Sequence, residues 1–97
     1  MAIYEATLHG NLDALVRRLH EEILAGSVSA SYENGSTFEI DGVRTEVRVY
    51  ERYSAFGDNR VSLTVTLCGK TGSGAADTIR LSAITSGGSQ ALFYKLN

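Results

Sequence analysis

Three arginines recur at every fourth position between residues 44 and 52, as Arg44, Arg48 and Arg52, and Tyr50 lies inside this row. Alternate residues of a β-strand face the same way, so the spacing places all four side chains on one side of a strand. We expect Arg80, on a later strand, to share that side. Guanidinium groups bind carboxylates and phosphates through two parallel hydrogen bonds. The row therefore indicates an anion-binding surface on the outer face of a sheet.

Two other interpretations fit the same row. An exposed antiparallel face needs charged residues for solubility, and Glu46 could pair with the arginines beside it. Alternatively, Tyr50 among arginines is the arrangement with which a sheet stacks nucleic-acid bases. A single aromatic residue, a net charge of −2 and a pI near 5.6 make nucleic acid the less favoured partner.

A second candidate is a glycine- and serine-rich stretch near the C-terminal end of the sequence. Its residues are Ser86, Gly87, Gly88, Ser89 and Gln90. Successive amides in such a loop can converge into an anion-binding nest, and hydroxyl groups add donors. The stretch lacks the lysine and the spacing of a P-loop, so a tight turn between two strands is the simpler interpretation.

Residue types for catalysis or metal binding do not occur at useful spacing. His9 and His20 have no cysteine or carboxylate at metal-ligand distance along the sequence. No serine fits a strand-to-helix elbow. Cys68, the single cysteine, has the properties of a small packing residue. The sequence thus predicts no catalytic residue, no metal and no cofactor, and an enzyme is less favoured than a binding protein.

The sequence predicts one amphipathic helix, which would lie against the strands that carry these candidate residues. Its apolar residues follow helical spacing, at Leu12, Leu15, Val16, Leu19 and Ile23. Asn11 is suited to cap the N-terminus, and Gly26 can end the helix in the left-handed conformation.

Alternating residues predict strands over 3–9, 28–33, 38–40, 43–53, 60–68 and 78–85, and a final strand is expected over 91–96. Asn34-Gly35 is expected to end the second strand, and Asp41-Gly42 is a two-residue hairpin signal. Tyr4 and Tyr32 fall on the inward phase of their strands. In the predicted strand 43–53, the β-branched residues are expected to face inward and the arginines outward. The inward residues are Val43, Thr45, Val47 and Val49.

These elements predict a single α+β domain over residues 1–97. The architecture is a two-layer sandwich, with one N-terminal helix on one face of a mostly antiparallel sheet of about five to seven strands. The lone cysteine, the absence of a signal-peptide pattern and the absence of a long apolar run predict a cytoplasmic protein without membrane attachment. Two sheet edges and the apolar run 91–94 predict a homodimer.

Three stretches together resemble a known family: 47–54 (VRVYERYS), 59–63 (NRVSL) and 82–91 (SAITSGGSQA). The family comprises small bacterial cytoplasmic proteins and is known only as a domain of unknown function. The resemblance extends over most of the chain and implies no activity, substrate or catalytic residue. The predicted function is therefore that of a small binding or interaction module, self-associating or binding an anionic ligand or partner, with RNA or single-strand binding as the alternative.

Overall fold

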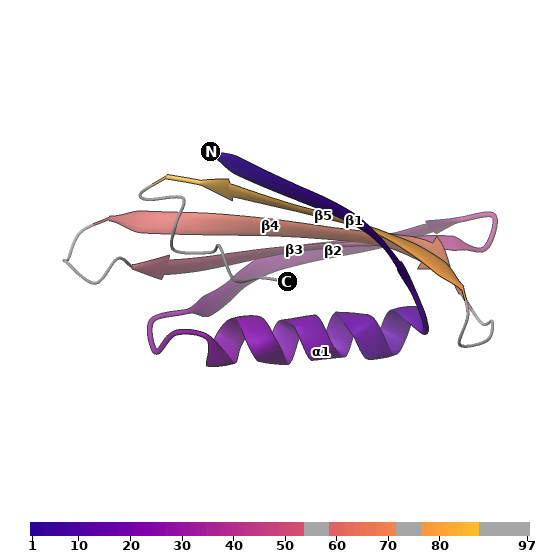
Figure 1. Ribbon diagram of the computed structural model, residues 1–97, viewed down its shortest axis with the longest axis horizontal. Coiled ribbons are helices and arrows are strands. Elements are labelled where there is room, and N and C mark those ends of the chain that lie inside the picture. Colours follow the sequence, from indigo (N-terminus) through magenta and orange to yellow (C-terminus); the bar gives the residue numbers. More distant parts are fainter. Residues whose placement is uncertain (54–58, 72–76, 88–97) are drawn as a thin grey trace.

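The computed structural model describes residues 1–53, 59–71 and 77–87. It is an α+β fold in which one helix packs against an antiparallel sheet (Figure 1). The elements in chain order are β1 (Ala2–His9), α1 (Leu12–Ala25), β2 (Ser31–Ile40), β3 (Val43–Tyr53), β4 (Arg60–Lys70) and β5 (Thr78–Ser86). The prediction of an α+β fold with one helix packed against an antiparallel sheet is confirmed.

Within the described residues the sheet has five strands in the order β1-β5-β4-β3-β2. Every neighbouring pair is antiparallel. Strands β1 and β2 form the two edges, and β4 lies at the centre of the sheet, where it contacts α1. The count is at the lower end of the predicted five to seven. The strand expected over 91–96 lies outside the described residues.

Helix α1 begins at its predicted cap. The side-chain oxygen of Asn11 accepts a hydrogen bond from the Ala14 amide at 2.9 Å, which satisfies one of the free donors of the first turn. Gly26 follows the helix with φ −74°, so the predicted left-handed ending is wrong. Its N–H still donates to the Ile23 carbonyl at 3.2 Å, which continues the right-handed turn. With 14 residues, α1 is too short and too polar to span a membrane, and the described residues contain no other helix.

The hairpin between β2 and β3 confirms one turn prediction and overturns another. Asp41 and Gly42 both have positive φ, 54° and 77°, as a type I′ turn requires, and Ile40 pairs with Val43 across it. By contrast, Asn34-Gly35 does not end a strand. Strand β2 continues through it, with a shift in register between Tyr32 and Asn34.

Gly35 is required inside β2 for its lack of a side chain. A Cβ atom at this position would lie 2.4 Å from the Tyr32 hydroxyl and 2.8 Å from the Val47 carbonyl oxygen. The ring of Tyr32 therefore lies back over its own strand, toward β3. This close approach, rather than a turn, explains the glycine in the Asn-Gly pair.

The face of β3 that meets the helix is opposite to the predicted one. Tyr50 pairs with Leu63 and Glu46 with Leu67, so the even residues of β3 share the face of the buried leucines of β4. Tyr50 is 1% exposed and Glu46 is buried, whereas Val43, Val47 and Val49 lie on the open face of the sheet. Beneath α1, the core is formed mainly by two strands, through Leu63, Val65, Leu67, Ile79, Leu81 and Ala83.

The reversal has a physical cause in the position of α1. The helix covers the centre of the sheet, and its buried stripe of Leu12, Val16 and Ile23 packs on β4 and β5. Strand β3 lies under the polar flank of the helix, where long polar side chains can reach helical partners. Valine favours strands through its stiff branched side chain, and this preference holds on either face. A run of alternating valines therefore did not mark the inner side.

Candidate functional site: a polar groove beside helix α1

An open groove of about 540 Å³ runs between α1 and β3. Its polar lining comprises three helical residues and three strand residues, Asp13, Arg17, His20, Arg44, Glu46 and Arg48. Three arginines face two carboxylates here, so the lining carries one net positive charge besides the histidine. The volume lies within the range of small-molecule sites.

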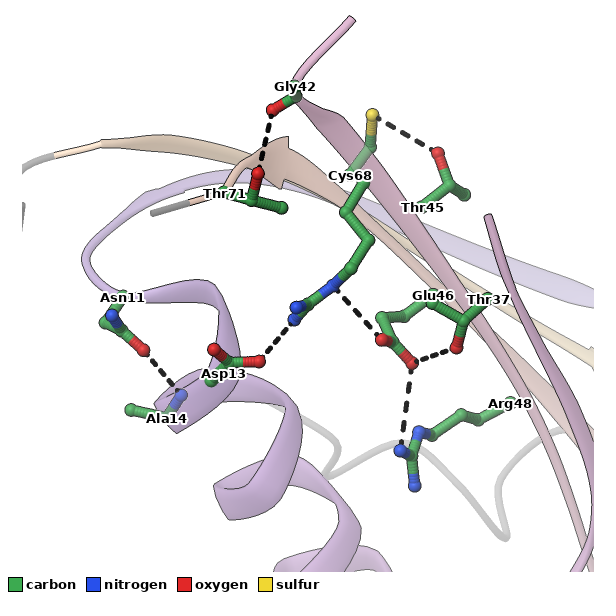
Figure 2. Close-up of polar contacts among 11 residues, drawn as sticks. Asn11, Asp13, Ala14, Thr37, Gly42, Thr45, Glu46, Arg48, Cys68 and Thr71 are labelled. Atoms are coloured by element: carbon green, nitrogen blue, oxygen red, sulfur yellow. Dashed lines mark hydrogen bonds and ion pairs between the residues drawn. The ribbon is translucent and has the colours of Figure 1, made fainter. Parts of the chain in front are cut away.

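Glu46 and Arg44 are the most closely paired residues of the groove. Arg44 Nε lies 3.2 Å from Glu46 Oε2, and Arg44 Nη2 lies 2.6 Å from Asp13 Oδ1 of the helix. The other carboxylate oxygen of Glu46 accepts from Thr37 Oγ1 at 3.0 Å, as Figure 2 shows. The charge of Arg44 is thus matched by two carboxylates at short range. Glu46 is buried, so its desolvation is offset by these contacts.

Arg48 is held more loosely. Its Nη2 lies 3.7 Å from Glu46 Oε1, and its Nη1 lies 3.4 Å from His20 Nδ1 (Figure 2 shows the first contact). Its Nε is buried and has no hydrogen-bond partner among the described residues. The guanidinium carbon lies 5.7 Å from the centroid of the Tyr32 ring, a cation–π geometry. Arg48 is therefore oriented by its neighbours without a close anionic partner.

An aromatic cluster supports Arg48 from the core side. The rings of His20, Tyr32 and Tyr50 lie 5.5 to 5.7 Å apart, centroid to centroid. His20 Nδ1 is 2.8 Å from the Tyr50 hydroxyl. Because the guanidinium of Arg48 has only donors, Nδ1 is the acceptor, and Nε2 is then the donor of the ring. This tautomer also lets Tyr50 donate to Nδ1.

Tyr50 is the titratable residue of this cluster with a shifted pKa. Burial raises the pKa of its hydroxyl above the ordinary value of 10.0, and hydrogen bonding and charge from Arg48 oppose that rise. The neutral hydroxyl is therefore favoured in the folded protein, which keeps its donor available to His20.

The structure separates the arginines that the sequence had grouped. Arg44, Arg48 and Arg52 face the helix side, not the open face, and the first two contact carboxylates of their own chain. Arg80 lies on the opposite face of the sheet, where its Nη1 donates to Thr7 Oγ1 at 2.6 Å. The predicted basic outer surface is therefore wrong in its geometry. Tyr50 is too buried to stack a base, so the platform required by the RNA alternative is not formed.

Of the glycine- and serine-rich candidate, the structure describes Ser86 and Gly87. Ser86 is the last residue of β5, and its carbonyl oxygen accepts from Ser62 Oγ at 3.5 Å. Gly87 has φ +82°, and a Cβ there would lie 2.7 Å from the Arg60 carbonyl oxygen, so it makes a close backbone approach. The other three residues of this prediction, Gly88, Ser89 and Gln90, lie outside the described residues.

Three groove residues on the helix were missed by the sequence reasoning. Asp13, Arg17 and His20 recur at intervals of four and three, so they form one stripe along α1, beside its apolar stripe. Polar residues on a helix flank normally face solvent, and the stripe gains meaning only from the strand beneath it. In the described ranges no three His, Cys, Asp or Glu side chains gather as a metal site.

A second, smaller groove lies along the other flank of α1. It has a volume of about 250 Å³ and is lined mainly by apolar residues, including Tyr4, Leu8, Leu15, Leu19 and Leu81. At its rim Arg18 Nε pairs with Glu22 Oε2 at 2.8 Å, and both side chains are exposed. This groove presents no uncompensated charge, so we place the candidate site on the polar side.

The fold and groove define a small α+β protein with one helix-covered sheet face and a charged cleft at the helix flank. The family model described as "Family of unknown function (DUF6054)" matches residues 1–97, and the chain belongs to this family. The sequence-based resemblance to a domain of unknown function is thereby confirmed. A comparison with curated proteins found no match.

Proposed function

We propose that the chain is a binding module that holds a small carboxylate- or phosphate-bearing compound in the polar groove. The proposal depends mainly on Arg48, whose guanidinium has no close anionic partner among the described residues. Its guanidinium is largely buried, its contacts with Glu46 and His20 are long, and its Nε lacks a partner among the described residues. The buried Nε is out of reach of the groove, and Arg44 and Arg52 also have a buried Nε. The Nη atoms of Arg48, however, have only long contacts and can pair with an anion there.

The surroundings of Arg48 support this role. Tyr32 and His20 flank the guanidinium, which reduces the side-chain entropy lost on binding. Arg17 lines the same groove from the helix and adds a second cation. Arg44 is already matched by two carboxylates, so we assign it to holding Glu46 and Asp13 in place.

For the setting of this binding we propose the cytoplasm, as the sequence predicts. The single cysteine supports it, because a chain with one cysteine forms no internal disulfide. Cys68 lies half-buried on the open face, where Thr45 Oγ1 is 3.6 Å from its sulfur.

The test is a titration followed by amide NMR, with inorganic phosphate and citrate as separate probes at constant ionic strength. We expect saturable shifts of residues around the groove for at least one probe. Arg48→Gln should weaken that binding by about tenfold or more, because a charge-assisted pair is lost. The matched control is Arg80→Gln, which removes an arginine from the opposite face and should leave the affinity unchanged.

The two probes distinguish the source of the anion. A preference for phosphate indicates a phosphorylated ligand, and a preference for citrate indicates a carboxylate. Equal weakening by Arg48→Gln and Arg80→Gln would indicate general charge attraction and contradict the proposal, as would shifts that do not saturate with either probe.

A further inference from the structure

The edge strand β2 is exposed along its whole length. All ten of its residues are exposed, because the buried residues of α1 pack mainly on β4 and β5 and no residue of β2 belongs to this core. An edge strand presents unpaired N–H and C=O groups, and proteins usually protect such edges with lysine, proline or bulges. Strand β2 contains no lysine, arginine or proline. Its one irregularity precedes Asn34, so residues 34–40 form a regular edge of seven residues, which among the described strands pairs with β3 alone.

The open face beside this edge is apolar. Phe38 and Ile40 lie on that face of β2, and Val43, Val47 and Val49 lie on the same face of β3; we call these five residues the β2 corner. Phe38 is 53% exposed and Ile40 is 70% exposed. The opposite edge carries a smaller apolar patch, because Ile3 of β1 pairs there with Ile84 of β5, and the next pairs along the open face are Glu5 with Ser82 and Thr7 with Arg80. Among the described strands, the larger exposed apolar patch beside an edge therefore lies at β2.

We propose that two copies of the chain associate through β2, as antiparallel neighbours related by a two-fold axis at Thr37. A strand that pairs antiparallel with itself makes the same contact from both sides and closes as a dimer. The register that pairs all seven regular residues is centred on their midpoint, Thr37. The contact lies on the β2 edge, adjacent to the Tyr32 ring that flanks Arg48 of the polar groove, and the inference does not depend on the proposed function.

This register is consistent with the side chains on both faces. On the open face Phe38 lies opposite Ser36 of the second copy, and the two phenylalanine rings become diagonal neighbours, which joins the two β2 corners into one apolar surface. On the helix side Glu39 lies opposite Gly35 of the second copy, so the two Glu39 carboxylates are kept apart.

Glu39 also gains a partner in this register. Its side chain has no ion pair or hydrogen bond within the described chain. The position of Gly35 lies directly under the Tyr32 hydroxyl. The carboxylate of Glu39 from one copy therefore meets the Tyr32 hydroxyl donor of the other, with Arg48 behind it. The match of acceptor to donor favours a second copy over an unrelated partner.

The size of the contact sets its expected strength. Seven strand residues per copy are fewer than the roughly 20–30 per side of a standard interface. We therefore expect a dimer that dissociates on dilution. Sedimentation velocity from about 10 µM to about 1 mM should show the shift from monomer to dimer required by mass action.

Two matched substitutions locate the contact. Phe38→Lys places two cations near the two-fold axis and should raise the dissociation constant by about tenfold or more. Ile3→Lys is the control, since Ile3 is an equally exposed apolar residue, at 63%, on the open face of the other edge strand. It should leave association unchanged. A monomer at all concentrations, or a dimer lost only with Ile3→Lys, would overturn the proposal.

Cysteine cross-linking tests the register without relying on the stability of Phe38→Lys. In a Cys68→Ser background, Thr37→Cys should form a disulfide-linked dimer, because directly opposed strand residues meet the Cα spacing of a disulfide. Glu39→Cys should not, because its two copies would be about 14 Å apart along the strands. Cross-linking at position 39, at both positions or at neither would refute the two-fold axis at Thr37.

Discussion

The two flanks of helix α1 cover the same sheet by different means. On the β1 side, Leu15 and Leu19 line a groove with Leu8 and Leu81, and the charged residues among its described lining are Arg18 and Glu22, an exposed pair at the rim. On the β3 side, the buried Glu46 is held by Arg44 and Thr37. The difference shows that a helix can be anchored by apolar packing on one side and by a polar network on the other.

The two flanks of α1 also differ in the hydrogen-bond donors that they offer to a ligand. Apolar packing is non-directional and approximately proportional to the area buried, so it presents no donor to a ligand. The polar network requires specific distances between donors and acceptors. Because the contacts of Arg48 are long, its donors are left for a ligand. The same side that fastens the helix is therefore the one able to recognise an anion.

The largest effect is expected from the apolar core. Ile79 is fully buried beneath α1, and Ile79→Ala should lower the free energy of unfolding by about 2–5 kcal/mol through lost transfer energy and a cavity. Urea denaturation followed by circular dichroism would measure it. As a control, Ile3→Ala at an exposed edge should cost about 0.5 kcal/mol or less. A similar loss for both variants would contradict the core assignment.

A smaller effect is expected from the polar network. Glu46→Gln keeps the shape and a hydrogen bond to Thr37 but leaves Arg44 and Arg48 without their shared carboxylate. We expect a loss of about 1–3 kcal/mol, since hydrogen bonds to charged groups are stronger than neutral ones. Glu51→Gln is the control, because Glu51 pairs with Arg60 on the open face. If Glu46→Gln is as mild as this control, the polar side does not anchor the helix.

Tyr50→Phe should cost about 0.5–1.5 kcal/mol by removing the hydrogen bond to His20. The pH dependence of this stability difference tests the role of the Tyr50 hydroxyl more specifically. Burial raises the pKa of Tyr50 in the folded state, so its contribution is fully present below the unfolded value of about 10 and is lost as the pH rises through the folded value. Unfolding curves between about pH 8 and pH 11 should therefore converge for the two proteins at high pH. A constant difference would show that Tyr50 does not carry this linkage.

The smallest effect is expected at the rim of the apolar groove. Arg18 and Glu22 are an exposed pair one helical turn apart, and Arg18→Ala should shift the urea midpoint less than any of the variants above. Salt at about 1 M should remove even that difference, because exposed charges are screened. A loss comparable to that of Glu46→Gln would mean that both flanks are anchored by charge.

The sequence by itself determined the helix, the Asp41-Gly42 turn and the span of β3, but not the course of β2, which continues through the turn predicted at Asn34-Gly35. Helical spacing and Asn11 set α1, the Asp41-Gly42 pair fixed the β2–β3 hairpin, and alternation defined β3 from Val43 to Tyr53. Each of these depends on neighbouring residues along the chain, through local hydrogen bonds and backbone conformations, so the sequence carries the information directly.

Only the tertiary structure decided which side of β3 is inside. Alternation gives two sides but does not say which one meets the helix, and valine suits either of them. That choice was made by the pairing of Tyr50 with Leu63 across β3 and β4 and by the partners that α1 offers to Arg44 and Arg48. The polar groove is assembled from residues about 30 positions apart, and their proximity is a property of the packed fold rather than of any local pattern.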